Sequence, residues 1–521
     1  MARVACGAFV AWSVSVGLAT IAAAQTPATV PAAAPDVDSP PPGPRLSLRE
    51  VLQQASTGNP DLRRQRVAIN LANANVLAAE GQFDFALTGD ATFARRFSPR
   101  ISTSQILPAF AQTFTANLAL VRPLESGGQI SLAAQDIVSN SQICITQPSM
   151  PSVCTFGGNL TYYNSNLNLV FTHPLLRGFG TEIATANLRK QRIQRDVSLL
   201  NRQAAAAVVI RDVVSAYWDL GYTADDLQIR RSAVTLAQQQ RAYTQAQVDV
   251  GRLGQADLAA VDRAIADRLQ DVALAEQTLL IRALDLERLM GRAVVATFVA
   301  PTPSERPSSS EPAPIDTVAE TARALQSSPQ LRALRAGLEL SEIDVRTAQA
   351  LLRPKLDFTG SVGTAGVQFG FGEAWSQAAR FENIVWSAGL AFQLPLQNRA
   401  ARGNEQAARA SGEAARIDLG DLELGIRDGV VRMTAAARTA ARRRELARAA
   451  VGYAQKNLDA ERARFEVGRS TNNDVLLRQQ ELKNAEIQIA RASADLANAE
   501  TALAALTGEI LDRYGVLLRG S

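Results

Sequence analysis

Apolar residues recur at alternating spacings of three and four near the C-terminal end of the chain, which is the seven-residue repeat of a coiled coil. The repeat runs through a predicted helix at 472–507, and an equivalent helix is predicted at 255–290. Each helix therefore presents an apolar stripe to a neighbour. In the earlier helix Arg268 and Arg282 interrupt the stripe. The later stripe consists of Leu482, Ala485, Ile489, Ala492, Leu496, Ala499, Leu503 and Leu506, and the earlier one of Ile265, Val272, Ala275, Leu279, Leu286 and Leu289.

Each of these helices follows a much longer proline-free stretch. The stretches run from about 181 to 250 and from about 400 to 467, and helices of that length would each span about 100 Å. Shorter helices are predicted at 59–81 and 328–352, where Asn-Pro and Ser-Pro place a capping residue before a proline at the first helical position. The lengths predict that two short helices stack end to end beside each long one.

Between the opening helix and the long helix of each half, polar and apolar residues alternate, which predicts β-strands. In the first half the strands lie within about 83–173 and include a hairpin formed by 113–121 and 129–137. In the second half they lie within about 356–394. One polar and one apolar face fit the wall of a β-barrel with lipid outside and water inside, and they fit a β-sandwich equally. The strand pattern alone leaves both architectures open.

The two halves of the chain are copies of one another. The sequence Val-Gly-Arg at 250–252, followed by Asp257, corresponds to Val-Gly-Arg at 467–469, followed by Asp474, at a separation of 217 residues (468 minus 251). The same separation holds through the whole helical hairpin, which indicates a tandem duplication. The chain is therefore expected to contain a signal peptide at 1–24, a flexible Pro/Ala-rich leader at 25–45, a first repeat at 46–291, a linker at 292–314, a second repeat at 315–508 and a C-terminal tail at 509–521.

The first residues have the pattern of an export signal. Arg3 precedes an apolar run at 8–24 that ends in three alanines, the small-residue pattern that signal peptidase cuts. An N-terminal membrane anchor is the alternative, but the run is shorter than the roughly 20 residues that a spanning helix needs. No later segment is a continuous apolar helix of that length. We therefore expect an exported protein that could enter a membrane only as a β-barrel.

Composition narrows the range of functions. The 54 Lys and Arg residues nearly balance the 50 Asp and Glu residues, and so small and scattered a basic excess predicts no nucleic-acid partner. His173, the one histidine, precedes Pro174 at a strand end and is expected to be structural, so no metal site, other cofactor or enzymatic activity is expected. Cys144 and Cys154 lie close together in a polar loop of an exported chain. We favour a local disulfide between them over free thiols.

Several weak motifs recur in a specific order and spacing. They are the two Val-Gly-Arg tips, the sequence Ala-Tyr-Trp-Asp-Leu at 216–220, and the strand-to-helix turns at Pro174 and Pro395. Taken together, the order, the duplication and the spacing of these motifs resemble those of the TolC-type outer membrane efflux proteins, which are also called outer membrane factors. The resemblance extends from about Leu46 to Gly508.

The resemblance implies a mainly α fold with a membrane β-barrel, in which three copies of the chain close one barrel in the outer membrane lipid and one periplasmic tunnel of coiled-coil helices. Such a homotrimer is the exit duct of a tripartite efflux or type I secretion system. A periplasmic adaptor (membrane fusion) protein joins it to an inner membrane pump of the RND, ABC or MFS type. The alternative is a structural or adhesive cell-surface coiled-coil protein with a β-barrel anchor.

The strands depart from the family pattern. Family members contribute four strands per chain to a barrel of twelve, whereas this sequence offers an additional hairpin at 113–137. Either the hairpin enlarges the barrel toward eighteen strands or it folds outside the barrel. We favour the second arrangement.

The resemblance also assigns roles to the two tips. Gly251, Arg252, Gly468 and Arg469 are expected to lie at the periplasmic end, where the adaptor docks. Asp474 matches the acidic residue that narrows the entrance. Three copies of this carboxylate around one axis would repel each other and attract cations, which makes a charge-sensitive periplasmic gate.

The network that closes this gate in the family is altered here. Phe465 lacks the hydroxyl of the usual aromatic residue, and only Ser470 matches the usual arginine. Arg469 could pair with Asp257 instead. An alternative interpretation is that Asp257 and Asp474 only stabilise the first turn of the helices they begin.

Overall fold

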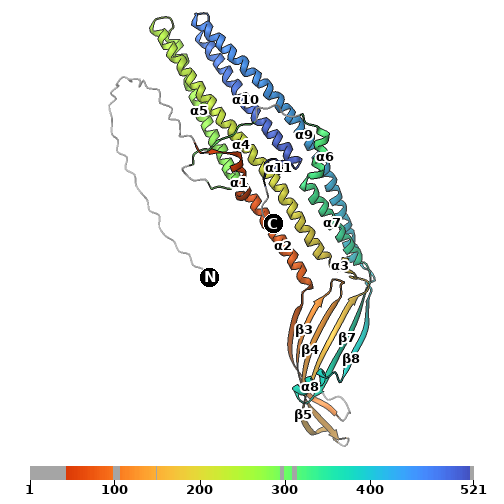
Figure 1. Ribbon diagram of the computed structural model, residues 1–521. Helices are drawn as coiled ribbons and strands as arrows, with labels where there is room; N and C mark the ends of the chain where they lie inside the picture. The colour runs from red at the N-terminus through yellow and green to blue at the C-terminus, as the bar shows by residue number, and fades with distance from the viewer. Residues whose placement is uncertain (1–42, 98–105, 148–149, 294–297, 308–313, 517–521) are drawn as a thin grey trace, which may run out of the picture. The chain divides into compact units, whose positions relative to one another are not determined.

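The computed structural model describes residues 43–97, 106–147, 150–293, 298–307 and 314–516. Within these ranges the chain is mainly helical and also forms one six-stranded sheet (Figure 1). The helices are α1 (Leu48–Gly58), α2 (Pro60–Glu80), α3 (Thr181–Ala184), α4 (Ala186–Asp249), α5 (Gln255–Met290), α6 (Thr317–Ser327), α7 (Pro329–Ala350), α8 (Phe371–Ala379), α9 (Arg399–Glu466), α10 (Asn472–Leu506) and α11 (Ile510–Arg513), with a short 3-10 helix at Gly81–Phe83.

The long helices pair into two hairpins. Helices α4 and α5 form one hairpin and α9 and α10 form the other, while α10 also packs along α4 (Figure 1). Near its start α4 contacts α2, where Val76 and Ala79 pack against Leu188. Nearer its end α4 contacts α5, through a cluster that includes Leu227 and Val272. Because α7 and α10 both pack on α9 in the same way, each long helix is accompanied by two shorter ones.

The two short helices of the first repeat meet at a close-packed joint. Asn59 caps α2 by accepting a hydrogen bond from the Asp61 N–H at 2.9 Å, and its Nδ2 donates to the carbonyl of Leu289 in α5 at 2.8 Å. Gly291 ends α5 with a φ of 74°, and a Cβ atom there would lie 2.1 Å from the Gly58 carbonyl oxygen. Only glycine combines this left-handed backbone with so close an approach.

The second repeat has an equivalent joint between α7 and α10. Ser328 caps α7 by accepting a hydrogen bond from the Leu331 N–H at 3.3 Å. The neighbouring Ser327 donates its hydroxyl to the carbonyl of Thr507, which directly follows α10. Gly508 then leaves the helix with a φ of 79°. The Asn-Pro and Ser-Pro sequences therefore both start a helix and tie it to the end of the next one.

The largest group of buried apolar residues surrounds the middle of α4. Tyr217 is fully buried there. Its hydroxyl donates to the carbonyl of Leu46 at 3.1 Å and accepts from the N–H of Glu305 at 3.2 Å. These residues adjoin a parallel pair formed by β1 (Arg45–Leu46) and β6 (Thr302–Pro303). The segment between the repeats is thus fastened to the same core as the start of the first repeat.

The remaining strands form one antiparallel sheet in the order β2-β3-β4-β5-β7-β8 (Figure 1). The hairpin predicted at 113–137 corresponds to β3 and β4, which pair with β2 on one side and with β5 on the other. We favoured a hairpin folded outside the barrel, whereas the structure places it inside the one sheet that the other strands form, because its alternation of polar and apolar residues continues that of its neighbours. The strands are β2 (Ala86–Phe97), β3 (Ile106–Pro123), β4 (Gln129–Gln147), β5 (Met150–Pro174), β7 (Lys355–Gln368) and β8 (Ile384–Gln393).

The sheet has one apolar and one polar face. On the polar face, side-chain hydrogen bonds cross four strands: Asn117 donates to Asp90 at 2.9 Å, Gln135 to Asn117 at 2.8 Å and Asn166 to Gln135 at 3.5 Å. On the apolar face, six directly opposed residues form a row across all six strands. The row consists of Leu87, Leu120, Leu132, Leu169, Val362 and Trp386.

Strands β2 and β8 are the two edges of this sheet. Within the described residues neither has a partner on its outer side. Their side chains are exposed, including Leu87 at 68%, Phe93 at 67% and Trp386 at 75%. The sheet therefore leaves both hydrogen-bonding edges and the row of apolar side chains from Leu87 to Trp386 exposed in a single chain.

Candidate functional site

The two tips of the hairpins have the same backbone geometry. Gly251 and Gly468 adopt φ values of 74° and 73°, the left-handed region that favours glycine. The N–H of the following arginine then bonds back across the end of the long helix, from Arg252 to Gln247 at 2.9 Å and from Arg469 to Arg464 at 2.8 Å. Both arginines are exposed. The Val-Gly-Arg sequences thus end each long helix and leave a basic side chain in solvent.

Thr471 is the N-cap of α10, and Asp474, at the third helical position, completes a capping box with it. Its Oδ2 accepts hydrogen bonds from the Thr471 hydroxyl at 2.6 Å and the Thr471 N–H at 3.1 Å, while its own N–H donates to Thr471 Oγ1 at 3.3 Å. These bonds hold the pKa of the Asp474 carboxyl below its ordinary value. A carboxylate at the start of a helix is also stabilised by the helix dipole. The carboxylate therefore stays ionised close to the tip.

Asp257 has the equivalent position at the start of α5 with a weaker cap. Its Oδ2 accepts only from the N–H of Gly254, at 3.1 Å, because glycine has no hydroxyl to complete the pair. The described residues show no ion pair between Asp257 and Arg469. The pairing that we considered for Arg469 is therefore not formed in this structure.

Ser470 takes part in a network within the second tip. Its hydroxyl donates to Glu461 Oε1 at 2.5 Å, and Glu461 is also 3.6 Å from Arg464 and 4.0 Å from Arg478. Arg478 in turn pairs with Glu481 at 2.8 Å. This network therefore joins α9 to α10 within one hairpin.

The first hairpin contacts the second one close to the tips. The buried Gln240 of α4 donates to the Oδ1 of the buried Asn472 at 2.7 Å, and Asn472 donates to the carbonyl of Asp257 at 3.4 Å. In addition, the rings of Tyr243 and Phe465 lie 5.5 Å apart at an angle of 52°. Phe465 therefore reaches the neighbouring hairpin through an aromatic contact in place of a hydrogen bond.

Arg268 of α5 makes the next contact between the hairpins. It is only 5% exposed, and its guanidinium donates to the Ala233 carbonyl of α4 at 2.7 Å and to Gln479 Oε1 of α10 at 3.1 Å. Burial lowers the pKa of Arg268, although an arginine remains charged at neutral pH. One buried cation therefore joins three helices from both repeats.

An ion-pair network lies one helical turn further along α10. The ammonium of Lys483, 7% exposed in its side chain, is 2.8 Å from Asp271 of α5. Asp271 is also 3.4 Å from Arg230 of α4, which pairs with Asp226 at 2.9 Å. Asn472, Gln479 and Lys483 follow one face of α10 at spacings of seven and four. This face carries polar contacts between the repeats in the part of α10 that is nearest to the tips.

One of these residues had a signal in the sequence and two did not. Arg268 occupies an apolar position of the seven-residue repeat, and a charge in such a stripe needs a buried partner. Gln479 and Lys483 are ordinary residues of a polar helix face when read alone. Their partners lie 211 and 212 residues away, so only the packing of the repeats reveals them.

The remaining candidate residues lie in or next to the strands of the sheet. Pro174 ends β5 opposite Asp357, and Pro395 follows β8. His173 stacks on Phe171, with ring centres 5.7 Å apart. The backbones of Cys144 and Cys154 lie in β4 and β5, but their side chains are outside the described part, so the disulfide stays a prediction: the register pairs are Cys144 with Gly157 and Thr146 with Cys154.

Among the described residues, none of the helices combines the length and the apolar character that a membrane span needs. The same residues hold no group of three or more His, Cys, Asp or Glu side chains placed to bind a metal ion.

Comparison with known proteins gives a family match for part of the chain and a shared fold for most of it. The family model described as outer membrane efflux protein matches residues 321–509. No curated protein matches the chain. The solved outer-membrane channel OprN aligns with a TM-score of 0.65 and 16% identity, covering 89% of this chain and 90% of OprN. The outer membrane protein VceC from Vibrio cholerae aligns with a TM-score of 0.63 and 15% identity over 89% of this chain and 96% of VceC.

A third channel gives the same result. The MtrE outer membrane channel of Neisseria gonorrhoeae, solved in an open state, aligns with a TM-score of 0.62 and 17% identity over 89% of each chain. Identities this low establish a common fold. The chain thus carries an outer membrane efflux protein domain at 321–509 and has the fold of the outer membrane factor channels over most of its length.

Proposed function

We propose that the protein is the outer membrane exit duct of a tripartite efflux or type I secretion system. Three copies form the duct, and substrates reach it from an inner membrane pump through a periplasmic adaptor. The shared fold with outer-membrane channels and the match at 321–509 support this proposal. The pump supplies the energy, and this chain supplies the passage.

The observation that carries the proposal is the two-faced sheet with its two free edges. The apolar row from Leu87 to Trp386 suits lipid, and the polar row from Asp90 to Asn166 suits a water-filled lumen. In lipid an unpaired edge leaves backbone groups unsatisfied, so β8 of one copy is proposed to pair with β2 of the next. Because β3 and β4 belong to the sheet, three copies of six strands would close a barrel of eighteen.

The tips are proposed to be the periplasmic end of the duct. Gly251 and Gly468 expose Arg252 and Arg469 for contact with the adaptor. Asp474 is proposed to form the acidic ring of the gate, because its lowered pKa keeps it charged. Asp257 is proposed to act through its backbone carbonyl, which accepts from Asn472.

The contacts along α10 are proposed to hold the gate in its resting position. Asn472, Gln479 and Lys483 each bind a residue of the first repeat. Opening the entrance would move the second hairpin away from the first, which would break these contacts in order from the tip. Each buried polar pair left unmade costs about 1–3 kcal/mol, so the adaptor would have to supply the difference.

Purification and conductance together test the duct. The full chain should be recovered from outer membrane fractions as a heat-modifiable trimer, and the trimer should conduct ions in a planar lipid bilayer. A structural or adhesive coiled-coil protein would give trimers without conductance. Recovery of the chain as a soluble monomer would contradict both functions.

A further inference from the structure

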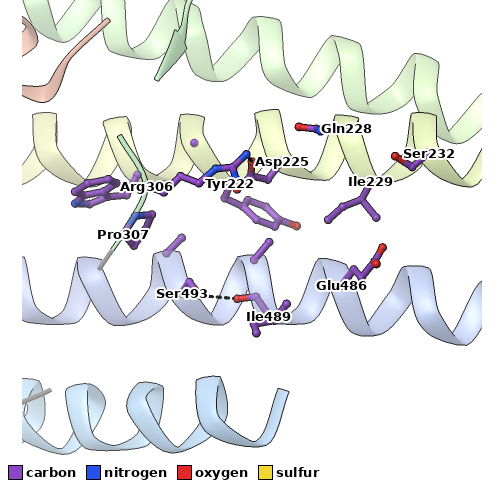
Figure 2. Close-up of a pocket in the computed structure, with 14 residues that line it drawn as sticks. Tyr222, Asp225, Gln228, Ile229, Ser232, Arg306, Pro307, Glu486, Ile489 and Ser493 are labelled. Atoms are coloured by element: carbon purple, nitrogen blue, oxygen red, sulfur yellow. Dashed lines mark hydrogen bonds and ion pairs between the residues drawn. The ribbon is translucent and has the colours of Figure 1, made fainter. Parts of the chain in front are cut away.

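A cavity of about 460 Å³ lies between α4 and α10, further from the tips than the ion pair of Lys483 with Asp271. Figure 2 shows Tyr222 and Ile229 of α4 and Glu486 of α10 reaching into the space between the two helices. Arg306 and Pro307, from the segment between the repeats, border it on another side. Its volume falls in the range of about 300–1,000 Å³ that small-molecule sites occupy.

Glu486 continues the contact face of α10. It lies three residues after Lys483, so it points toward the first repeat like Gln479 and Lys483. Those two residues have partners on α5, whereas within the described residues Glu486 has neither a hydrogen bond nor an ion pair to any side chain. Beyond Glu486, α10 again contacts α4 through Arg491 and Asn498, which both lie close to Asp219. Glu486 is therefore one unpaired carboxylate beside a cavity, between paired residues on either side.

The charges around the cavity do not balance. Asp225 and Arg306 form an ion pair at 2.7 Å and cancel each other. Burial raises the pKa of the Glu486 carboxyl, and no nearby cation offsets this. A half-buried carboxylate without a partner is costly, and a cation placed against it would recover that cost. Among the described residues, the Glu486 carboxylate thus has no cationic partner in the cavity.

The lining indicates which kind of cation fits. Glu486 belongs to no group of three or more metal-binding side chains among the described residues, whereas Ca²⁺ and Mg²⁺ require several oxygen ligands. Ile229, Ile489 and the ring of Tyr222 give apolar contact area instead. That ring already attracts one cation, because the Arg491 guanidinium lies 5.1 Å from its centroid.

We propose that the cavity between α4 and α10 binds an organic cation, with its charge against the Glu486 carboxylate and its apolar body against Tyr222 and Ile229. Trp218 also lines this cavity. The site lies between the two repeats, so an occupant touches both. The proposal does not depend on the exit-duct function, since binding to the purified protein measures it directly.

Calorimetric titration of the purified full-length protein with benzyltrimethylammonium tests the site. We expect saturable binding that weakens by at least about tenfold in Glu486→Gln, which keeps the shape of the side chain and removes its charge. The matched control is Glu339→Gln, which removes the same charge from an exposed position on α7 and should leave affinity unchanged. The neutral dimethylbenzylcarbinol, similar in shape, should bind the unmodified protein at least about tenfold more weakly.

A second variant tests the site independently, in case Glu486→Gln does not fold. Ala490→Leu fills the cavity without changing its charge and should also weaken binding of the cation. Circular dichroism would establish that both variants keep their helices. Absence of saturable binding to the unmodified protein, or equal affinity in Glu486→Gln, would overturn the proposal.

Discussion

The Arg268 guanidinium of α5 and the Gln479 side chain of α10 meet across 211 residues of sequence, with Nη1 and Nη2 each 3.1 Å from Oε1. Arg268 lies at an apolar position of the seven-residue repeat, so its charge is buried where its neighbours bury methyl groups. Burial of an ion is a poor source of stability by itself. The position is better explained by the contact it makes with the other repeat.

Variants of Arg268 and Gln479 should change the free energy of unfolding and the bilayer conductance in different ways. Arg268→Met leaves Gln479 buried and unpaired, so the free energy of unfolding should fall by about 1–3 kcal/mol. The additional change Gln479→Leu should restore most of that loss, because both polar partners are then gone. Bilayer conductance should be raised in both variants, since both lack the contact between the repeats.

Arg282 provides the matched control for this pair of variants. It is the other arginine in the same stripe, and its side chain is 51% exposed. Arg282→Met should change neither the thermal unfolding midpoint nor the conductance. Unchanged conductance in Arg268→Met would remove Arg268 from the gate.

The contribution of Lys483 to stability should depend on its positive charge. In Lys483→Met the Asp271 carboxylate keeps only Arg230, at 3.4 Å, so the free energy of unfolding should fall by about 1–3 kcal/mol. Lys483→Arg keeps the cation and should lose less than half as much. Equal losses in the two variants, measured by chemical denaturation of the purified trimer, would show that packing rather than charge matters at this position.

Asp474→Asn tests the acidic ring while keeping a side-chain oxygen for the cap. Cation selectivity and block by divalent cations should both decrease in bilayer recordings, because three negative charges are lost from the entrance. Asp257→Asn, at the equivalent position of the first hairpin, should change them less. Identical recordings from Asp474→Asn and the unmodified protein would place the gate elsewhere.

The block should also depend on pH in a defined direction. The pKa of Asp474 is lowered, so the carboxylate is fully charged above the ordinary aspartate value of about 4. Both the block and the capping contribution should persist at that pH and disappear only as the pH falls through the lowered value. Loss of the block well above pH 4 would indicate that another group carries the charge.

Gly291 should tolerate no side chain at the joint between α5 and α2. Gly291→Ala places a Cβ 2.1 Å from the Gly58 carbonyl oxygen and forces a φ of 74° on alanine, so the thermal midpoint should decrease. The backbone strain alone costs about 1–2 kcal/mol. Gly337→Ala, in α7 with no heavy atom within 4 Å of the new Cβ, should instead stabilise the protein by about 0.5–1 kcal/mol.

Much of this fold was predictable because local signals and packing agree. The seven-residue stripe is confirmed: Leu482, Ala485 and Leu496 are buried in α10. The alternation of the strands also identified all six members of the sheet. It could not show where β3 and β4 pair, because an alternating pattern fits any neighbouring strand with the same two faces.

The remaining features could not be predicted from the sequence, because they arise from how the elements pack in three dimensions. The helix α8, between β7 and β8, had no signal that we recognised, and it packs so closely that a Cβ on Gly366 would lie 1.9 Å from the Ala374 carbonyl oxygen. Likewise, Glu486 is an ordinary acidic residue in the sequence. Only its position beside a cavity, past Gln479 and Lys483, shows that its charge is unbalanced.

The two free edges of the sheet determine how copies of the chain can associate, but they do not determine how many copies do so. Because β2 and β8 are different strands, association through them is head-to-tail, and such a contact has no built-in end. A ring forms only if the angle between copies closes, and otherwise the same contact yields an open ribbon. The sheet edges therefore specify that copies join, while the stoichiometry must be set by the angle at which the helical hairpins of adjacent copies meet.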